Sequence, residues 1–430
     1  MLFGTDGIRG LPGQGYLKGE EIVKVAGAFS KFLGKNSKVG LCRDTRASGP
    51  DMESSVISGL TLAGSDAYSF GVLNTPAAAF LSKTLGLDGV IIVSASHNPA
   101  NENGLKFFSG RGTKLSVGDE EEIEKIYLGQ RVKNSKAGKI HPSEEKIGKY
   151  VDFAVSTSNK LKLKAVLDCS NGAAYKTAPE IFKKIGLEIT ILNDKPNGKN
   201  INDNCGSEHP ESLQAAVRKS KADVGIALDG DADRTLLVDE TGKVLTGDQL
   251  IGLCALSMKK RGKLAKNKVV VTHYSNFGLE KALSESGISV VRADVGDRAV
   301  AEMMTKVGAN LGGEQSGHLI FSDLMPTGDG ILTAIQVLNV ITQEKLPLSK
   351  LASRIVKVPQ VLINVDVLEK KPYPKLEKEI ALLSKGFDGR IFVRYSGTQN
   401  MIRIMVEGKS EKQINDAAQK LAREAREELG

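Results

Sequence analysis

The feature that most constrains the fold of this chain is one local pattern that occurs three times. An apolar run rich in β-branched residues is followed by a short polar loop and then by a helical pattern, opening at Lys38–Asp44, Lys164–Asp168 and Lys268–Thr272. Short runs of this kind predict buried strands, and strands that alternate with helices are typical of mostly parallel α/β sheets. Because the openings are a domain's length apart, they predict three related α/β units.

The C-terminal part has a different pattern. Strand-like and helix-like segments occur there without regular alternation, at Pro359–Val367, Lys375–Leu383, Gly389–Val393, Ile402–Val406 and Glu411–Leu429. This order predicts a smaller α+β domain. The expected fold is therefore three related α/β domains with mixed, mostly parallel sheets and a C-terminal α+β domain, with the boundaries 1–146, 147–240, 241–350 and 351–430. Residues 119–160 are charged and poor in apolar runs, and we interpret them as a helix, a hairpin-like excursion and a linker.

Composition excludes several classes of protein. Of the 430 residues, 40% are hydrophobic and 26% are charged, as in ordinary globular proteins. The net charge of +8 is not concentrated in any basic block, so nucleic acid is not an expected partner. No apolar run approaches the roughly 18 residues of a membrane span, and the amino terminus does not resemble a signal peptide. The four scattered cysteines predict reduced structural thiols and a cytoplasmic location.

A candidate nucleophile lies in the stretch from Val90 to Phe108. The apolar run Val90–Val93 predicts a buried strand, and it leads into a loop with the sequence SASHNP. A serine beside a histidine at the end of a buried strand suits covalent catalysis, although an isolated pair of this kind is more often a turn. Because Ser96 and His97 are adjacent in the chain, we expect the His97 side chain to point away from the Ser96 oxygen.

A candidate metal site follows another predicted strand. The run Val224–Leu228 leads into the sequence DGDADR, which places acids at positions 229, 231 and 233. Asp229, Asp231 and Asp233 are separated by very small residues, so their carboxylates can converge on one point. They would repel each other strongly unless a cation lay between them. Hard oxygen ligands in this number favour Mg²⁺.

Two further loops give weaker signals. In GEQSGH, Glu314, Ser316 and His318 alternate, so an extended backbone would project them from one side toward sugar hydroxyls. A glycine-rich turn is an equally good interpretation. In RYSGT, Arg394 and the backbone around Gly397 would suit a phosphate, although a simple hairpin turn fits the same residues.

In this order, the motifs FGTDGIRG, SASHNP, DGDADR, GEQSGH and RYSGT resemble those of the α-D-phosphohexomutase superfamily. The resemblance covers essentially the whole chain. It implies a heart-shaped molecule in which each of four domains contributes one loop to a central cleft. Within the superfamily, the opening FGTDGIRG and Gln315 are similar to the members that act on phosphorylated amino sugars.

The resemblance also implies roles for residues that occupy the family's motif positions. Ser96 corresponds to a phosphorylated serine whose oxygen joins Asp229, Asp231 and Asp233 as ligands of one Mg²⁺ ion. The positions around the transferring phosphate are Arg9, His97, Lys106 and Arg234, and His318 corresponds to a proposed general base. The other substrate-binding positions are Arg298, Glu314, Ser316, Arg394, Ser396, Gly397, Thr398 and Arg403.

The implied reaction is an isomerisation of glucosamine 6-phosphate to glucosamine 1-phosphate through a phosphoserine enzyme and a 1,6-bisphosphate, which also serves as primer. Such a reaction belongs to amino sugar metabolism and the synthesis of cell-wall precursors; a homodimer is left open. The alternatives are a mutase of mannose or glucose phosphates, a non-catalytic phosphosugar sensor and a Mg²⁺ phosphatase. The chain departs from the family at Gln399 and Asn400, where Glu-Pro is usual, which makes the sugar preference less secure.

Overall fold

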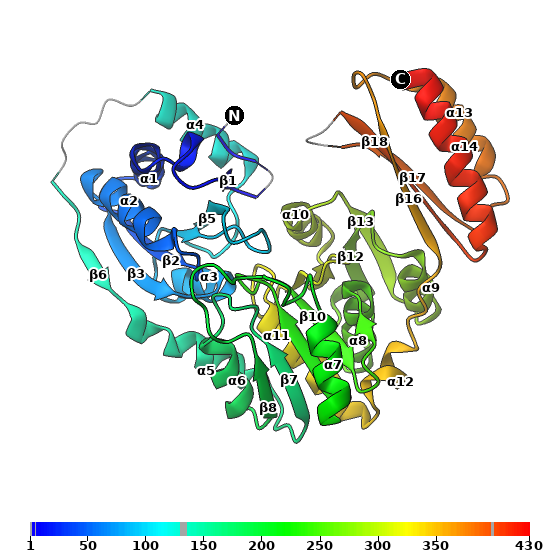
Figure 1. The fold of residues 1–430 in the computed structure, drawn as a ribbon, viewed down its shortest axis with the longest axis horizontal. Helices are drawn as coiled ribbons and strands as arrows, with labels where there is room; N and C mark the ends of the chain where they lie inside the picture. Colours follow the sequence, from blue (N-terminus) through cyan, green and yellow to red (C-terminus); the bar gives the residue numbers. More distant parts are fainter. Residues whose placement is uncertain (1, 5, 130–135, 397–399) are drawn as a thin grey trace.

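The computed structural model describes residues 2–4, 6–129, 136–396 and 400–430. Within these residues the chain forms four sheets, one for each successive part of the sequence. Figure 1 shows them along an arc, from the blue N-terminal unit through the green and yellow middle units to the orange and red C-terminal unit. The α/β units with a C-terminal α+β unit confirm the predicted fold class.

The first sheet has the strand order β1-β5-β4-β2-β3-β6. Its centre is β4, in which every residue is buried, as its apolar β-branched sequence predicts. Strands β4, β2, β3 and β6 are parallel neighbours, whereas β5 pairs antiparallel with both β4 and β1. The elements are β1 (Ile8–Gly10), η1 (Gly15–Leu17), α1 (Gly19–Leu33), β2 (Lys38–Arg43), α2 (Gly49–Leu62), β3 (Asp66–Val72), α3 (Thr75–Thr84), β4 (Gly89–Val93), β5 (Asn103–Ser109), α4 (Val117–Leu128) and β6 (Ile140–Pro142).

The second and third sheets repeat the predicted opening, with β7 and β12 as central parallel strands. The second, in the order β11-β10-β9-β7-β8, comprises η2 (Glu144–Lys146), α5 (Gly148–Ser156), β7 (Lys164–Asp168), α6 (Thr177–Lys184), β8 (Glu188–Leu192), α7 (Glu211–Ser220), β9 (Val224–Leu228), β10 (Thr235–Asp239) and β11 (Val244–Leu245). The third, in the order β13-β12-β14-β15, comprises α8 (Gly247–Lys260), η3 (Ala265–Asn267), β12 (Lys268–Thr272), α9 (Phe277–Glu285), β13 (Ser289–Ala293), α10 (Asp297–Val307), β14 (Leu311–Gly313), β15 (Leu319–Phe321), α11 (Gly330–Glu344) and α12 (Leu348–Ala352).

The fourth sheet is small and antiparallel, in the order β16-β18-β17, and two helices cover one of its faces (Figure 1). Its elements are β16 (Gln360–Asp366), α13 (Pro374–Leu383), β17 (Gly389–Tyr395), β18 (Met401–Gly408) and α14 (Glu411–Leu429).

The interpretation of residues 119–160 is wrong in its second half. Strand β6 is not part of a hairpin, because it pairs in parallel with β3 at the edge of the first sheet. Residues 148–156 form α5 instead of a linker, and this helix buries Tyr150, Val151 and Ala154. The apolar positions three and four apart in YVDFA were a helical signal that the surrounding charge concealed.

The buried hydrophobic side chains form one large cluster that spans three units and a separate cluster in the fourth. One continuous cluster of buried side chains runs from the first unit through the second and third, and it includes Val90, Leu167 and Leu332. The fourth unit has its own cluster, which includes Ile404 and Leu421. In the part of the chain that is described, no helix is long and apolar enough to cross a bilayer.

Candidate active site

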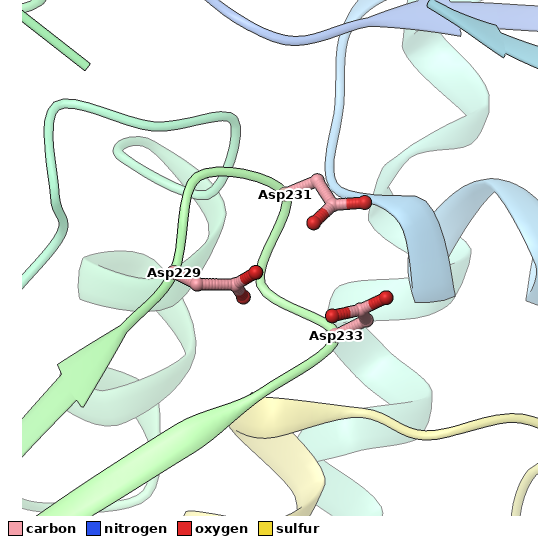
Figure 2. Close-up of side chains that lie close together, drawn as sticks. All are labelled: Asp229, Asp231 and Asp233. Atoms are coloured by element: carbon pink, nitrogen blue, oxygen red, sulfur yellow. The ribbon is translucent and has the colours of Figure 1, made fainter. Parts of the chain in front are cut away.

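Three buried acids meet in the loop between β9 and β10. Asp229, Asp231 and Asp233 each place a carboxylate oxygen within 4.8 Å of the others, and Figure 2 shows the three carboxylates around one space. A left-handed residue, Ala232 at φ 56°, bends the loop so that the alternate side chains converge. Gly230 lies where an added Cβ would come within 2.5 Å of the Ser96 carbonyl oxygen, so the close approach of the two loops requires glycine there.

The electrostatics of this loop are those of a cation site. Burial, followed by the charges of Asp233 and Asp231, raises the pKa of Asp229 well above its usual range. Burial also acts to raise the pKa of Asp233, but Lys106 and His318 outweigh it and hold that pKa well below normal. The oxygens Asp231 Oδ1 and Asp233 Oδ1 are buried and accept no hydrogen bond from any described residue. Two buried carboxylate oxygens thus lack a hydrogen bond, and they lie beside Asp229, whose ionisation the other two acids oppose. Such a set of oxygen ligands fits a Mg²⁺ ion.

The predicted nucleophile lies against this loop. Ser96 is 1% exposed, and its hydroxyl donates a hydrogen bond of 2.7 Å to Asp229 Oδ2. Its backbone is left-handed at φ 52°, a conformation that non-glycine residues adopt rarely and mostly at functional turns. The expected orientation of His97 is wrong, because its Nδ1 lies 3.3 Å from Ser96 Oγ. Burial and the charge of Arg234 lower the pKa of His97, which favours a neutral ring.

Arg46 holds the Ser96 loop in shape, and sequence reasoning gave this residue no role. It is 1% exposed, and its guanidinium donates to the carbonyls of Ser96 at 2.9 Å and Asn98 at 2.8 Å. It also donates to Glu102 O at 2.9 Å, to Pro99 O, and to Asp44 Oδ2 at 2.9 Å. The one available signal was RDTR directly after a predicted strand, a position where loops carry function.

The predicted cations surround the acids. Lys106 on β5 is 2% exposed and places its ammonium 2.7 Å from Asp231 Oδ2 and 3.4 Å from Asp233 Oδ2. Burial disfavours this charge, but the acids prevail and raise the pKa of Lys106 well above normal. Arg9 on β1 donates to Ala95 O at 3.2 Å and so also tethers the Ser96 loop. Arg234 donates its backbone N–H to Asp229 Oδ1 at 3.1 Å.

Of the two interpretations of the GEQSGH segment, the structure shows the glycine-rich turn and not the extended backbone. The segment forms a tight turn between antiparallel strands β14 and β15, closed by a hydrogen bond of 3.0 Å from Gly317 N to Glu314 O. Glu314 and His318 nevertheless reach the same cavity, and His318 is 3% exposed with Nδ1 at 3.8 Å from Asp233 Oδ1. Burial opposes the charge on His318, but Asp233, Asp297 and Glu314 raise its pKa.

A cavity of about 460 Å³, which we name the front cavity, brings most of these side chains together. Its lining includes Arg9, His97, Asp233, Arg234, Glu314 and His318. A neighbouring cavity of about 440 Å³ shares Arg234 and Glu314 and adds Ser316 and Arg403 from β18. Both volumes lie in the range of small-molecule sites.

The other predicted substrate-binding residues lie further out. Arg394 is packed over the ring of Tyr274, with 5.4 Å between guanidinium and ring centre. Ser396 is 3% exposed at the end of β17, whereas Gly397 and Thr398 lie outside the described residues, as does Gln399. Arg298 lines neither of these two cavities and pairs with Glu120 at 2.5 Å and 2.9 Å. The roles of these residues stay predictions.

Three charged residues at the site had no assigned role. Asp6 contacts Arg9, Lys106 and Lys114, and Lys114 also contacts Asp297 at 2.6 Å. Burial acts to raise the pKa of Asp6, but Lys106, Lys114 and Arg9 hold it well below normal. Asp6 stands inside FGTDGIRG and could have been suspected. Asp297 directly precedes the predicted substrate-binding position Arg298, whereas Lys114 comes from an ordinary polar segment without a sequence signal of its own.

Comparison with known proteins places these features in one family. Sequence models for the phosphoglucomutase/phosphomannomutase α/β/α domains I, II and III match residues 1–133, 144–242 and 246–358, and the model for the C-terminal domain matches residues 362–424.

Two full-length relatives belong to the same family, and a solved structure has the same fold. A phosphoglucosamine mutase from Syntrophus aciditrophicus is 44% identical, covering 100% of this chain and 99% of the relative. A phosphoglucosamine mutase from Desulforamulus reducens is 44% identical, with 98% of each chain covered. The crystal structure of a phosphoglucomutase/phosphomannomutase family protein from Burkholderia thailandensis superposes with a TM-score of 0.86 at 24% identity, covering 99% of this chain and 97% of that one. This structure supports the fold.

Proposed function

The chain belongs to the phosphoglucomutase/phosphomannomutase family, among its phosphoglucosamine mutases, and we propose on this basis that it interconverts glucosamine 6-phosphate and glucosamine 1-phosphate. It is an isomerase that works by phosphoryl transfer. One observation carries the proposal most directly: Ser96 Oγ lies 2.7 Å from an oxygen of the buried three-acid cluster, with Lys106 beside it. The product would supply UDP-N-acetylglucosamine synthesis, and we propose a cytoplasmic location.

In the proposed cycle Ser96 carries a phosphoryl group and donates it to the free hydroxyl of the bound sugar phosphate. The resulting 1,6-bisphosphate turns round in the cavity and returns its other phosphoryl group to Ser96. Phosphoryl transfer depends chiefly on positioning and on stabilisation of charge on the transferring oxygens. Arg9, Lys106 and Arg234 are placed to provide such stabilisation.

Asp229, Asp231 and Asp233, with an oxygen on Ser96, would hold the Mg²⁺ ion. When bound, this ion would neutralise charge on the phosphoryl oxygens. The buried Lys106 would supply a second, fixed positive charge from β5 of the first sheet. His318 faces the same cavity from the third unit, where it would hold the proton exchanged with the sugar hydroxyl.

The two cavities joined at Arg234 suit a substrate with a phosphate at each end. One end would lie near Ser96, and the other near Arg403 on β18. Arginines bind phosphate through paired hydrogen bonds, and this mode does not depend on which end of the sugar carries it. Arg403 would therefore bind the phosphate of either the 1-phosphate or the 6-phosphate.

A substrate panel tests the proposal. With Mg²⁺ and catalytic glucosamine 1,6-bisphosphate, glucosamine 6-phosphate should have a higher kcat/KM than glucose 6-phosphate or mannose 6-phosphate. A higher kcat/KM for glucose 6-phosphate or mannose 6-phosphate would mean that the substrate is that sugar phosphate and not glucosamine 6-phosphate. Binding of all three without turnover would instead show a phosphosugar sensor. Size-exclusion chromatography with light scattering tests the homodimer, which stays a prediction.

Replacing one acid tests the metal site. Asp231→Asn removes a charge while keeping the shape of the side chain. We expect the Mg²⁺ concentration for half-maximal activity to rise at least about tenfold, because even the loss of a group that only supports a metal ligand costs about 10- to 100-fold in affinity. Asp203→Asn, an exposed acid of the same unit, is the matched control. An unchanged Mg²⁺ response in Asp231→Asn would count against the three-acid site.

A further inference from the structure

A closed ring of acidic and basic side chains joins the first, second and third units through the site. Starting at Asp6, it passes to Lys106 at 3.5 Å, to Asp233 at 3.4 Å and to His318 at 3.8 Å. From His318 it continues to Asp297 at 3.7 Å, to Lys114 at 2.6 Å and back to Asp6. The side chains are between 2% and 24% exposed, so these contacts are little screened by water.

The Lys114 side of the ring separates two cavities. Behind the front cavity lies a larger one of about 820 Å³, the rear cavity, between the segment 109–119 and helix α10. Lys114, Asp297 and His318 line both cavities. The rear cavity is lined by many polar groups, among them Thr113, and such a space holds water.

The front cavity extends to the nucleophile. His97 lines it, and His97 Nδ1 lies 3.3 Å from Ser96 Oγ. Water that crossed from the rear cavity into the front cavity would therefore approach the group on Ser96. Lys114 and Asp297 line both cavities, and the 2.6 Å contact of their ion pair leaves no room for a water molecule between the two side chains.

We propose that Lys114 and Asp297 are positioning residues whose ion pair closes the rear wall of the active site and limits hydrolysis of phosphorylated Ser96. This inference rests on the proposed function, because it needs a phosphoserine to protect. Asp297 Oδ2 also lies 3.7 Å from His318 Nε2, so the ion pair adjoins the imidazole that lines both cavities. Exclusion of water is what separates a phosphoryl carrier from a phosphatase.

The side reaction is simple to write. A water oxygen forms a bond to phosphorus, the bond from phosphorus to Ser96 Oγ breaks, and one water proton ends on Ser96 Oγ. The products are inorganic phosphate and the free serine. No oxidant, reductant or other co-reactant is required, and inorganic phosphate is easily measured.

The test uses full-length protein labelled at Ser96 with ³²P from glucosamine 1,6-bisphosphate and then freed of sugar. The first-order release of inorganic phosphate is compared among wild type, Lys114→Met and Asp297→Asn, which remove one charge each at nearly constant size. Tyr150→Phe is the matched control, because it removes a buried hydrogen bond of 2.8 Å to Asp329 between units but lies outside the rear wall. Phosphate released from the labelled bisphosphate gives the same readout for a variant that retains little label.

We expect both ring variants to release phosphate at least about tenfold faster than wild type, equivalent to about 1.4 kcal/mol of lost barrier, while Tyr150→Phe matches wild type. Two variants keep the test valid if one does not fold. Release at the wild-type rate in a folded ring variant would overturn the inference, even if turnover fell. A wild-type protein that takes up no label and has no turnover would instead refute the proposed function.

Discussion

At the scale of single residues, the nucleophile and the metal-binding acids could be predicted from the sequence, but the residues that hold the site in place could not. The residue types and spacing of Ser96 and the acids at 229, 231 and 233 predicted a nucleophile and a metal site, and the structure brings them together. Arg46, which donates hydrogen bonds to the Ser96 loop, and Lys114 and Asp297, which pair with each other beside Asp6 and His318, received no role from the sequence. Their contacts are long-range, and only the folded chain reveals which buried carbonyls and charges need a partner.

Arg46 offers the sharpest test at this scale. Arg46→Lys keeps the charge but cannot reproduce the planar group that reaches four backbone carbonyls of the Ser96 loop. We expect kcat to fall by about 10- to 100-fold through misplacement of Ser96, together with a lower Tm. Arg43→Lys, at the last residue of β2, makes the same substitution in a partly buried ion pair with Glu53 and is the control. Equal effects of the two substitutions on kcat would contradict a specific role for Arg46.

At the scale of elements, apolar runs and alternating patterns located most strands, whereas helix α5 was misinterpreted and the turn between β14 and β15 was one of two interpretations left open. In α5 the buried residues are few and lie among charges, so composition hid the period. In the turn, glycine at position 317 adopts φ 90°, which the alternation of polar residues did not reveal. Local pattern is a weak guide where tertiary contacts decide the backbone.

The start of helix α11 predicts a dependence of stability on pH. Asp329 caps this helix by accepting from Leu332 N at 2.9 Å, and Tyr150 donates to its other oxygen. Burial raises the pKa of Asp329 from 3.8 to about 6. The native state therefore holds a proton that the unfolded chain releases, so this stabilisation is complete below about pH 4 and is lost as the pH rises to about 6.

A difference of about 2 pKa units corresponds to about 3 kcal/mol of unfolding free energy. Asp329→Asn cannot titrate but can still cap the helix. Denaturant unfolding of wild type and variant is measured at about pH 4, 5, 6 and 7, which covers the ordinary and the raised pKa of Asp329. The variant should gain stability relative to wild type as the pH rises. A constant difference across this range would mean that Asp329 titrates normally.

At the scale of the whole molecule, the shared core makes the first three units one packed body, while the fourth has a core of its own. Polar groups connect the fourth unit to the third. Glu407 on β18 is fully buried, pairs with Arg390 at 2.6 Å and accepts from Asn276 Nδ2 at 3.2 Å at the start of α9. Polar contacts without a shared apolar core are typical of interfaces that permit relative motion of two units. Sequence pattern predicted the separate unit but not this joint, because its partners lie far apart in the chain.

Glu407→Gln should loosen this joint. We expect a higher KM for the sugar phosphate, because Arg403 would be less well placed, and an unchanged Mg²⁺ requirement, because the acids lie in another unit. Asp388→Asn, which removes an exposed pair with Lys409 in the same unit, is the control. A changed Mg²⁺ requirement with an unchanged KM would contradict this division of roles.

The central claim is that Ser96 carries the phosphoryl group, and intact mass spectrometry tests it most directly. Wild-type protein incubated with glucosamine 1,6-bisphosphate should gain the mass of one phosphoryl group, located to Ser96 by peptide fragmentation, and should lose it to glucosamine 6-phosphate. Ser96→Ala should gain none and lose nearly all turnover. Near-full turnover by Ser96→Ala, or a phosphoryl group located on another residue, would contradict the account.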